Sequence, residues 1–491
     1  MKTDVNSPLS RRIVLSGALA GLVGGLLSGA ALALLGLLPE IAAWVGAASP
    51  LVGFGFHMLM AALVGAGFGL LVWQQRPEAG EMLYWGLAYG VALWFLGPLT
   101  ALPLLWGQGL HWNLSAAQSA FPFLVAYLWY GTATSLALAW LRRDHSRASR
   151  GIASGGLLRG AAAGLLAAWL VGALLDDQGQ LLAFAMMMHQ PSAWVGWVLL
   201  IATGLLAGLT FALLYPLAGA SGGVGLARGL VYGFIWWVAG AQTLIPLLYD
   251  GHLAWSLDDA RSSFAFLPGF LLLGAALGLF YRWLGELARI LFTDIAGDLQ
   301  NEGAGARGLR ALGRGVVAGV VGGLLFTIIM VQIGFLPAVA SLIDATSPWT
   351  GLIVHLVISI LIGASYGLLF QRQSYDFGSG LGWGLSYGFF WWILGPLTLM
   401  PILLGKPPQW SLAVAAGLIA SLIGHLLYGA GLGVTFHLLE AHYNPWWIPR
   451  RQVRAARIAQ RKEQLSTSAP AVWAMVIALV MLAPILTMNP S

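Results

Sequence analysis

Two polar positions lie within long apolar stretches of the chain, where ionisable side chains are costly and are often kept for function. Both occur three times in a repeated sequence, as His57, Leu200 and His355 for the first position and as Tyr127, Phe270 and His425 for the second. The residues change together, since both positions are apolar in the same copy. We therefore expect the two positions to be neighbours. The polar pairs predict buried hydrogen-bonded contacts, and proton handling, metal binding and bis-histidine haem ligation are the alternatives.

A segment with proline and threonine is the second candidate for chemistry. It occurs in all three copies, and its candidate residues are Pro98, Thr100, Thr243, Pro396 and Thr398. Proline lacks an N–H, so it leaves the carbonyl one turn earlier without its hydrogen bond in the helix. The segment therefore predicts a kinked or broken helix. The threonine hydroxyls can satisfy the freed carbonyl groups, or they can line a solute site within a discontinuous helix. We expect the tryptophans that follow to anchor the outer membrane interface. These are Trp112, Trp255 and Trp410.

Acidic residues are concentrated in the middle copy. They are Asp176, Asp177, Asp250, Asp258 and Asp259. A negative outer mouth of this kind can attract cations or a basic partner. A solvated acidic loop is the alternative interpretation.

The chain lacks the usual motifs of catalysis. It has no Gly-rich phosphate loop with a lysine, no His-Glu-x-x-His and no nucleophile elbow. It also has no cysteine, which excludes disulfides, thiolate metal sites and covalent haem attachment. Apart from Asp176 and Asp177, we expect no charged residue deep in any membrane span, which disfavours a proton- or sodium-coupled antiporter. We predict that the protein is not an enzyme and has no catalytic residue, metal or cofactor, haem included.

The elements that carry these residues are membrane helices. The chain is 59% hydrophobic and 9% charged, whereas globular domains carry about 25% charged residues. Thirteen continuously apolar stretches of about 20 residues each predict an all-α polytopic membrane protein rather than a β-barrel. A cytoplasmic N-terminus places 22 of the 24 Lys and Arg residues inside. We expect a multi-pass protein of the cytoplasmic (inner) membrane, with its C-terminus outside.

Three tandem repeats organise these helices. Corresponding residues such as Trp94, Trp237 and Trp392 are 143 and then 155 residues apart. We predict three parallel four-helix units, of which the second is divergent, and a C-terminal segment with a thirteenth helix. Their ranges are 11–143 (unit 1), 154–286 (unit 2), 309–441 (unit 3) and 442–491. Three such units can close around a central cavity or pack in a row, and Gly-x-x-x-Gly pairs within them predict close helix packing.

A basic stretch precedes the last helix. It includes Arg450, Arg451, Arg454 and Arg457. It predicts an interfacial helix that binds anionic lipids, with control of membrane topology as the alternative. The lipid bilayer and other membrane proteins are the expected partners, and nucleic acid is not.

One of the units resembles a known family. The run from His355 through Ser359 to Tyr366, the helix with Pro396 and Thr398, and Gly424-His425-Leu426 are similar to YagU-type bacterial inner-membrane proteins. The resemblance covers about one unit and is closest in the third. It implies a multi-pass membrane protein without an established catalytic activity, with a link to pH homeostasis.

Two main functions fit this pattern. The first is passive or facilitated passage of a small neutral or weakly polar solute through a site formed by the broken third helices. The second is a non-catalytic scaffold, subunit or assembly factor of a larger membrane complex. A redox subunit associated with haem or quinone is the third.

Overall fold

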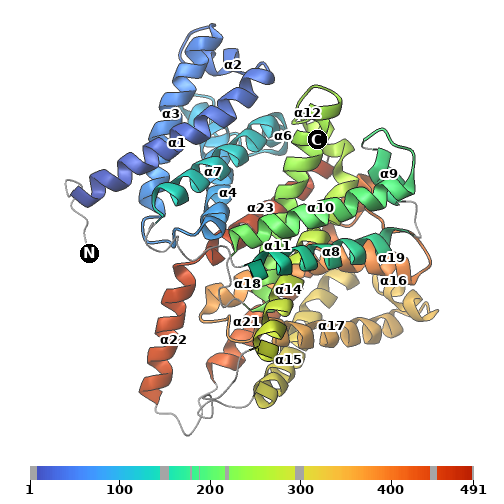
Figure 1. Ribbon diagram of the computed structural model, residues 1–491. Helices are drawn as coiled ribbons and strands as arrows, with labels where there is room; N and C mark the ends of the chain where they lie inside the picture. Colours follow the sequence, from blue (N-terminus) through green and yellow to red (C-terminus); the bar gives the residue numbers. More distant parts are fainter. Residues whose placement is uncertain are drawn as a thin grey trace.

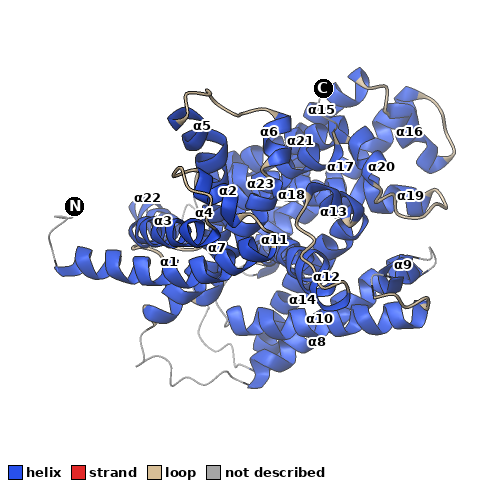
Figure 2. Cartoon of the chain, turned by 90° about the horizontal axis from the view of Figure 1, so that it is seen from above, coloured by secondary structure: helices blue, strands red, loops and turns tan. Residues whose placement is uncertain are grey.

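The computed structural model describes residues 8–143, 154–176, 180–186, 188–215, 221–292, 304–442 and 450–488. Helices joined by short loops make up this part of the chain, and it contains no strand (Figure 2). Thirteen of the helices are long and apolar enough to cross a membrane. The prediction of an all-α polytopic membrane protein is therefore confirmed.

Each repeat has four long helices, and the third of them is interrupted by a π-helical segment (Figure 1). Unit 1 contains α1 (Pro8–Leu34), α2 (Leu38–Ala43), α3 (Pro50–Leu71), α4 (Ala79–Leu96), η1 (Gly97–Ala101), α5 (Leu102–Leu105), α6 (Leu114–Ser119) and α7 (Phe121–Leu141). Unit 2 contains α8 (Ser154–Asp176), α9 (Gln180–Met186), α10 (Ala193–Leu214), α11 (Gly222–Trp236), η2 (Trp237–Leu244), α12 (Ile245–Tyr249), α13 (Leu257–Ser262), η3 (Phe264–Phe266) and α14 (Leu267–Phe292).

Unit 3 has the same order of elements, and two further helices follow it. It contains α15 (Ala304–Gln332), α16 (Leu336–Ala340), η4 (Ser341–Ile343), α17 (Pro348–Phe370), α18 (Phe377–Leu394), η5 (Gly395–Leu399), α19 (Met400–Leu403), α20 (Leu412–Gly417) and α21 (Ile419–Ala441). The chain then forms α22 (Arg450–Leu465) and the last membrane helix, α23 (Ala469–Thr487). The boundaries of the three units stay a prediction.

Glycines bring the third and fourth helices of each unit into backbone contact. A Cβ atom added to Gly86 would lie 2.2 Å from the carbonyl oxygen of Gly131, and one added to Gly131 would lie 2.0 Å from that of Gly86. The corresponding pairs, Gly229 with Gly274 and Gly384 with Gly429, are as close. Such small-residue contacts allow helices to pack tightly where lipid provides no hydrophobic driving force.

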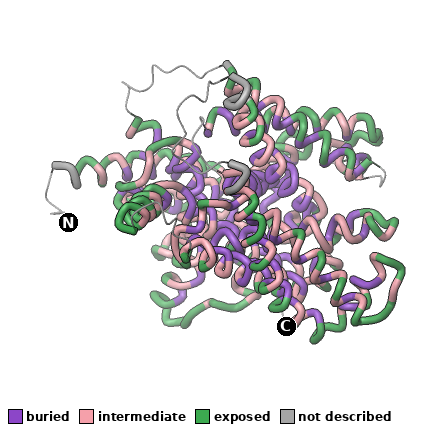
Figure 3. Tube along the Cα trace, turned by 90° about the horizontal axis from the view of Figure 1, so that it is seen from below, coloured by how far each residue is buried: buried purple, intermediate pink, exposed green. Residues whose placement is uncertain are grey.

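The C-terminal helix α23 lies among the three units. It contacts the third helix of every unit, α4, α11 and α18, and also the short helices α6, α13 and α20. In Figure 1 the red helix α23 crosses the middle of the molecule, and Figure 3 shows that buried residues concentrate there. The helix α23 therefore lies along the third helices of all three units, while its other face stays open, with Ile477 and Met481 48% and 51% exposed.

Two corresponding residues of units 1 and 2 hold the C-terminal end of α23. The Gln118 amide donates hydrogen bonds to the carbonyls of Ile485 and Met488, at 2.9 and 2.7 Å. The Arg261 guanidinium donates to the carbonyls of Leu486 and Met488, at 2.9 and 3.0 Å. These donors satisfy carbonyl groups that have no partner within the last turn of the helix.

The other end of α23 is held in a similar way. The residues at one repeated position, Trp85, Arg228 and Trp383, all contact the segment where α23 begins. The Trp85 indole donates to the carbonyl of Thr467 at 3.2 Å, and Arg228 donates to the hydroxyl of Ser468 at 3.3 Å. Polar contacts at both ends thus fix the position of α23 along its axis.

The basic helix α22 is fixed by contacts with protein as well. Arg457 donates to the carbonyls of Glu440 and Ala441 at the end of α21, and Arg461 lies 2.8 Å from Asp376. Partial burial would raise the pKa of Asp376, but hydrogen bonds from Ser379 and the charge of Arg461 outweigh it and hold that pKa below its ordinary value. The side chains left exposed for anionic lipids, which stay a prediction, are Arg450, Arg451 and Arg454.

Candidate functional site

The repeated threonines act as hydrogen-bond relays inside the π-helical segments. Each hydroxyl donates to the carbonyl five residues earlier at 2.8 Å and accepts the indole N–H of the tryptophan twelve residues later at 3.0 Å. The three relays are Phe95–Thr100–Trp112, Val238–Thr243–Trp255 and Ile393–Thr398–Trp410. The threonine hydroxyls therefore satisfy freed carbonyl groups, which is the structural role expected for broken helices.

Two of the three tryptophans are not interfacial anchors. Trp255 and Trp410 are only 1% and 4% exposed, whereas Trp112 is 59% exposed. Gly269 of unit 2 packs against the ring of Trp410 in unit 3. The expectation for Trp255 and Trp410 was wrong, because packing within the bundle covers side chains that hydropathy alone places at the membrane surface.

The relay gives a prediction with an internal control. Thr398→Val is expected to destabilise the protein by about 2 kcal/mol, because it leaves a buried carbonyl and a buried indole N–H without a partner. Thr100→Val should cost less, since the indole of Trp112 is exposed and can bond to water or lipid headgroups. The measurement is the free energy of unfolding of the purified protein in mixed micelles. Equal losses for the two variants would contradict this account.

The first histidine position lies in a cavity of unit 1. The cavity has a volume of about 470 Å³ and is lined by residues of α1, α2, α3, α4, η1, α5 and α7. Its wall is mainly apolar, and its polar side chains are Ser28, His57, Tyr127 and Tyr130. The structure therefore places His57 and Tyr127 around one space, as their joint variation indicates. Each makes its contacts separately, and the predicted hydrogen bond between them is not formed.

The hydrogen bonds of His57 determine which of its nitrogens is free. Its Nε2 lies 3.1 Å from the carbonyl oxygen of Gly25 and 3.1 Å from the hydroxyl of Ser28. A carbonyl oxygen can only accept, so Nε2 carries the hydrogen. The Ser28 hydroxyl in turn donates to the carbonyl of Gly24 at 2.9 Å. The neutral ring then keeps Nδ1 as a hydrogen-bond acceptor, and none of the described residues donates to it.

Tyr127 supplies a second polar group at the broken helix. A Cβ atom added to Gly97, the first residue of η1, would lie 3.3 Å from the Tyr127 hydroxyl oxygen. None of the described residues hydrogen-bonds to that hydroxyl, and its oxygen is not enclosed. The Tyr130 hydroxyl, in contrast, donates to the carbonyl of Ala61 at 2.7 Å. Tyr127 therefore keeps a donor and an acceptor available at the cavity wall.

The corresponding space in unit 3 is filled by an aromatic ring. Phe326 replaces Ser28 there, and the centroid of its ring lies 5.2 Å from that of His355 and 4.6 Å from that of His425. His355 bonds to the carbonyl of Gly323 and His425 to that of Ser421, at 3.0 and 2.8 Å. The two histidines are thus near each other but separated by Phe326.

In unit 2 the corresponding space is almost closed. Val171, Leu200 and Phe270 line a cavity of about 30 Å³, with Trp410 of unit 3 also in its wall. Only Ser28 among the three corresponding residues, Ser28, Val171 and Phe326, leaves a large space. The sequence shows the difference between Ser28, Val171 and Phe326. It does not indicate that this difference affects a cavity, because nothing in the sequence places residue 28 against residue 57.

The acidic residues of unit 2 do not form one site. Asp176 accepts a hydrogen bond from the Trp197 indole at 3.1 Å, Asp259 forms a capping box with Ser256, the N-cap residue of α13, and Asp250 lies 3.9 Å from His189. Asp258 is exposed beside Arg261, and Asp177 lies outside the described residues. Within the described ranges no three His, Asp or Glu side chains are placed to hold a metal ion.

A buried ion pair lies at the junction of units 1 and 2. Glu81 of α4 and Arg228 of α11 are 2.6 Å apart, and each side chain is 10% exposed. Neither charge lies deep in its span, since Glu81 is the third residue of α4 and Arg228 the seventh of α11; the sequence did not predict that the two would be buried together. Both helices begin earlier than their apolar stretches do, and the two charges are buried there because they neutralise each other.

Comparison with known protein families, with curated proteins and with solved structures finds no match to this chain.

Proposed function

We propose that the protein binds a small, mainly apolar molecule from the lipid bilayer in the cavity of unit 1, without a catalytic step. The observation that carries this proposal is the cavity of about 470 Å³ with His57 and Tyr127 in its apolar wall. Apolar cavities with a few well-placed polar groups are typical ligand sites. The free Nδ1 of His57 accepts and the Tyr127 hydroxyl donates. A ligand hydroxyl group can hydrogen-bond with either of them.

Two observations favour binding in unit 1 over passage through the three broken helices. The hydroxyls of Thr100, Thr243 and Thr398 are already engaged with carbonyl and indole groups. The helix α23 packs against the third helices of all three units, where a path shared by the three broken segments would lie. The packing of α23 against all three units also supports the second candidate function, a membrane scaffold with no ligand.

The test uses the residue that closes the same space in unit 3. Ser28→Phe is expected to reduce labelling of unit 1 by a diazirine-bearing long-chain alcohol about tenfold or more, because exclusion from the cavity costs at least about 1.4 kcal/mol. Ser28→Ala keeps the space and should retain most of the labelling. The reciprocal change, Phe326→Ser, opens the space in unit 3 and should create labelling there. Labelled peptides are identified by mass spectrometry after irradiation of the purified protein.

The outcome separates the two functions. Labelling that is spread evenly over the lipid-exposed helices, or that is unchanged by Ser28→Phe, would refute the ligand site and favour the scaffold. Helical circular dichroism and a single species in size-exclusion chromatography show that each variant is folded.

We also propose the orientation in which the N-terminus and the basic loops are cytoplasmic and the chain lies in the inner membrane. The asymmetry of Lys and Arg supports it, since 22 of these 24 residues are then inside. A reporter fused after Ser491 that is active only in the cytoplasm would contradict this orientation.

A further inference from the structure

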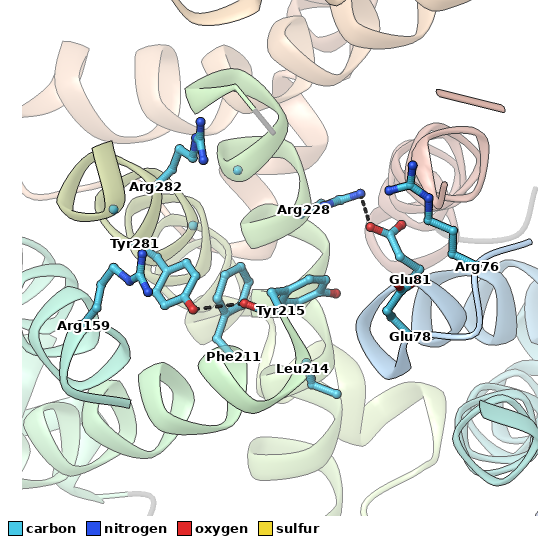
Figure 4. A pocket seen from close by; sticks show the side chains of 13 residues that line it. Arg76, Glu78, Glu81, Arg159, Phe211, Leu214, Tyr215, Arg228, Tyr281 and Arg282 are labelled. Atoms are coloured by element: carbon cyan, nitrogen blue, oxygen red, sulfur yellow. Dashed lines mark hydrogen bonds and ion pairs between the residues drawn. The ribbon is translucent and has the colours of Figure 1, made fainter. Parts of the chain in front are cut away.

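A second cavity lies between units 1 and 2 and has no part in the function proposed above. Its volume is about 260 Å³, and its wall is formed by the start of α4, α8 and α11, the end of α10, the loop before α4, and α14 (Figure 4). Four arginines line it: Arg76, Arg159, Arg228 and Arg282. These elements meet at the end of the bundle at which the chain begins, the end where most Lys and Arg residues lie.

Arg228 presents a free guanidinium nitrogen to this cavity. Its Nη2 donates to Glu81 and to the hydroxyl of Ser468, at 2.6 and 3.3 Å. Its Nη1 has no partner among the described residues and is not enclosed. Because Arg228 as a whole is only 8% exposed and lines the cavity, Nη1 is open to the cavity itself.

Two tyrosines hold the arginines in place. The guanidinium carbon of Arg159 lies 4.8 Å from the centre of the Tyr281 ring, and that of Arg228 lies 5.7 Å from the centre of the Tyr215 ring. The Tyr281 hydroxyl donates to the carbonyl of Tyr215 at 3.0 Å, and the Tyr215 hydroxyl donates to that of Gly80. Burial raises the pKa of Tyr215 well above its ordinary value, so this hydroxyl stays neutral. Figure 4 shows Arg159 beside Tyr281 and Arg228 reaching Glu81.

The wall is rich in donors and poor in free acceptors. One oxygen of Glu81 accepts from Arg228 and the other from the backbone N–H of Ser468, so both carboxylate oxygens already have a partner. Arg76 and Arg282 are paired with Glu463 and Glu286, and each uses only Nη2 for that contact. The other carboxylate in the wall, Glu78, is exposed to solvent.

We propose that this cavity binds a phosphate-type oxyanion at Nη1 of Arg228, with Arg159 and the other arginines of the wall adding to the positive potential. Guanidinium groups form strong, directional hydrogen bonds with phosphate oxygens, and the tyrosines keep them oriented before the anion arrives. The phosphate can belong to an anionic phospholipid of the adjoining leaflet or to a soluble phosphate compound. Both present the same oxygens to the site.

Two probes distinguish these sources in the full-length protein. Inorganic phosphate is titrated into protein held in a neutral detergent, and phosphatidylglycerol is titrated as a mixed-micelle component, with chloride at equal ionic strength as the reference. Thermal stability is the readout. A saturable shift with inorganic phosphate indicates a soluble ligand, and one with phosphatidylglycerol alone indicates a lipid headgroup. Either shift supports the site, whereas a shift no larger than that with chloride overturns it.

Variants on the wall test the assignment of residues. Arg159→Gln is expected to weaken binding of the effective probe about tenfold, since it removes one positive charge from the wall of the cavity. Arg159→Lys should retain part of the affinity. Glu78→Gln is the matched control on the same wall and should strengthen binding, because it removes a negative charge near the anion. Equal binding by wild type and Arg159→Gln would overturn the proposal, and a folded Glu78→Gln protein that binds more weakly would contradict its electrostatic basis.

Discussion

Replacing Glu81 by alanine is expected to destabilise the protein by about 3–5 kcal/mol, because it leaves a buried charge on Arg228 without its partner. The pair is short, at 2.6 Å, and both side chains are 10% exposed, so water does not replace the lost carboxylate. The variant also removes the acceptor of the Ser468 N–H at the start of α23. Unfolding in mixed micelles, followed by circular dichroism, measures the loss.

Two further variants show whether burial of the charge causes the loss of stability expected for Glu81→Ala. Glu463→Ala removes an exposed ion pair with Arg76 in the same region, and it should cost less than about 1 kcal/mol. The double variant with Glu81→Ala and Arg228→Met should recover most of the stability, since neither charge is then buried alone. A Glu81→Ala protein as stable as Glu463→Ala would show that the buried pair does not hold units 1 and 2 together.

Gly131→Ala is expected to cost about 3 kcal/mol, at the upper end of the range for overpacking. The added methyl group would lie 2.0 Å from the carbonyl oxygen of Gly86. Both α4 and α7 meet there through main-chain atoms, so no side chain can rotate away and the helices must separate. The same unfolding assay measures the effect.

Gly55→Ala is the matched control. A Cβ atom at Gly55, in the second turn of α3, has nothing within 4 Å. Because alanine favours a helix over glycine, this variant should be up to about 1 kcal/mol more stable than wild type. The two variants are thus expected to change the free energy of unfolding in opposite directions, which distinguishes the effect of close packing from that of helix propensity. Destabilisation of similar size in both variants would contradict the contact between α4 and α7.

The candidate site was partly predictable. Joint variation of His57 with Tyr127 and of His355 with His425 identified two positions that do lie around one space in each unit. The volume of that space was not predictable. It depends on a third residue on another helix, which is Ser28 in unit 1 and Phe326 in unit 3. The distance between residues 28 and 57 is a property of helix packing, and no local pattern in the chain encodes it.

The contacts of α23 were not predictable for a related reason. The sequence identified a thirteenth apolar helix, but hydropathy gives its length and not its neighbours. Gln118 and Arg261 occupy corresponding positions, and both donate hydrogen bonds to the end of α23. This shared role is visible only in the structure, where the end of α23 lies between units 1 and 2. Similarly, Glu81 and Arg228 are each a single charge at the edge of an apolar stretch, and neither indicates that the other lies beside it.

The sequence by itself determined the class of this protein, its thirteen membrane helices and the position of the broken segment in the third helix of each unit. These features depend on local composition and on repetition, since a helix satisfies its own backbone in lipid wherever it lies. The tertiary structure decided the rest: that α23 contacts all three units, that the threonines are engaged, that one cavity stays open in unit 1 and that arginines line another. Each of these depends on which side chains meet across helices far apart in the chain, and small differences in side-chain volume and charge decide the result there.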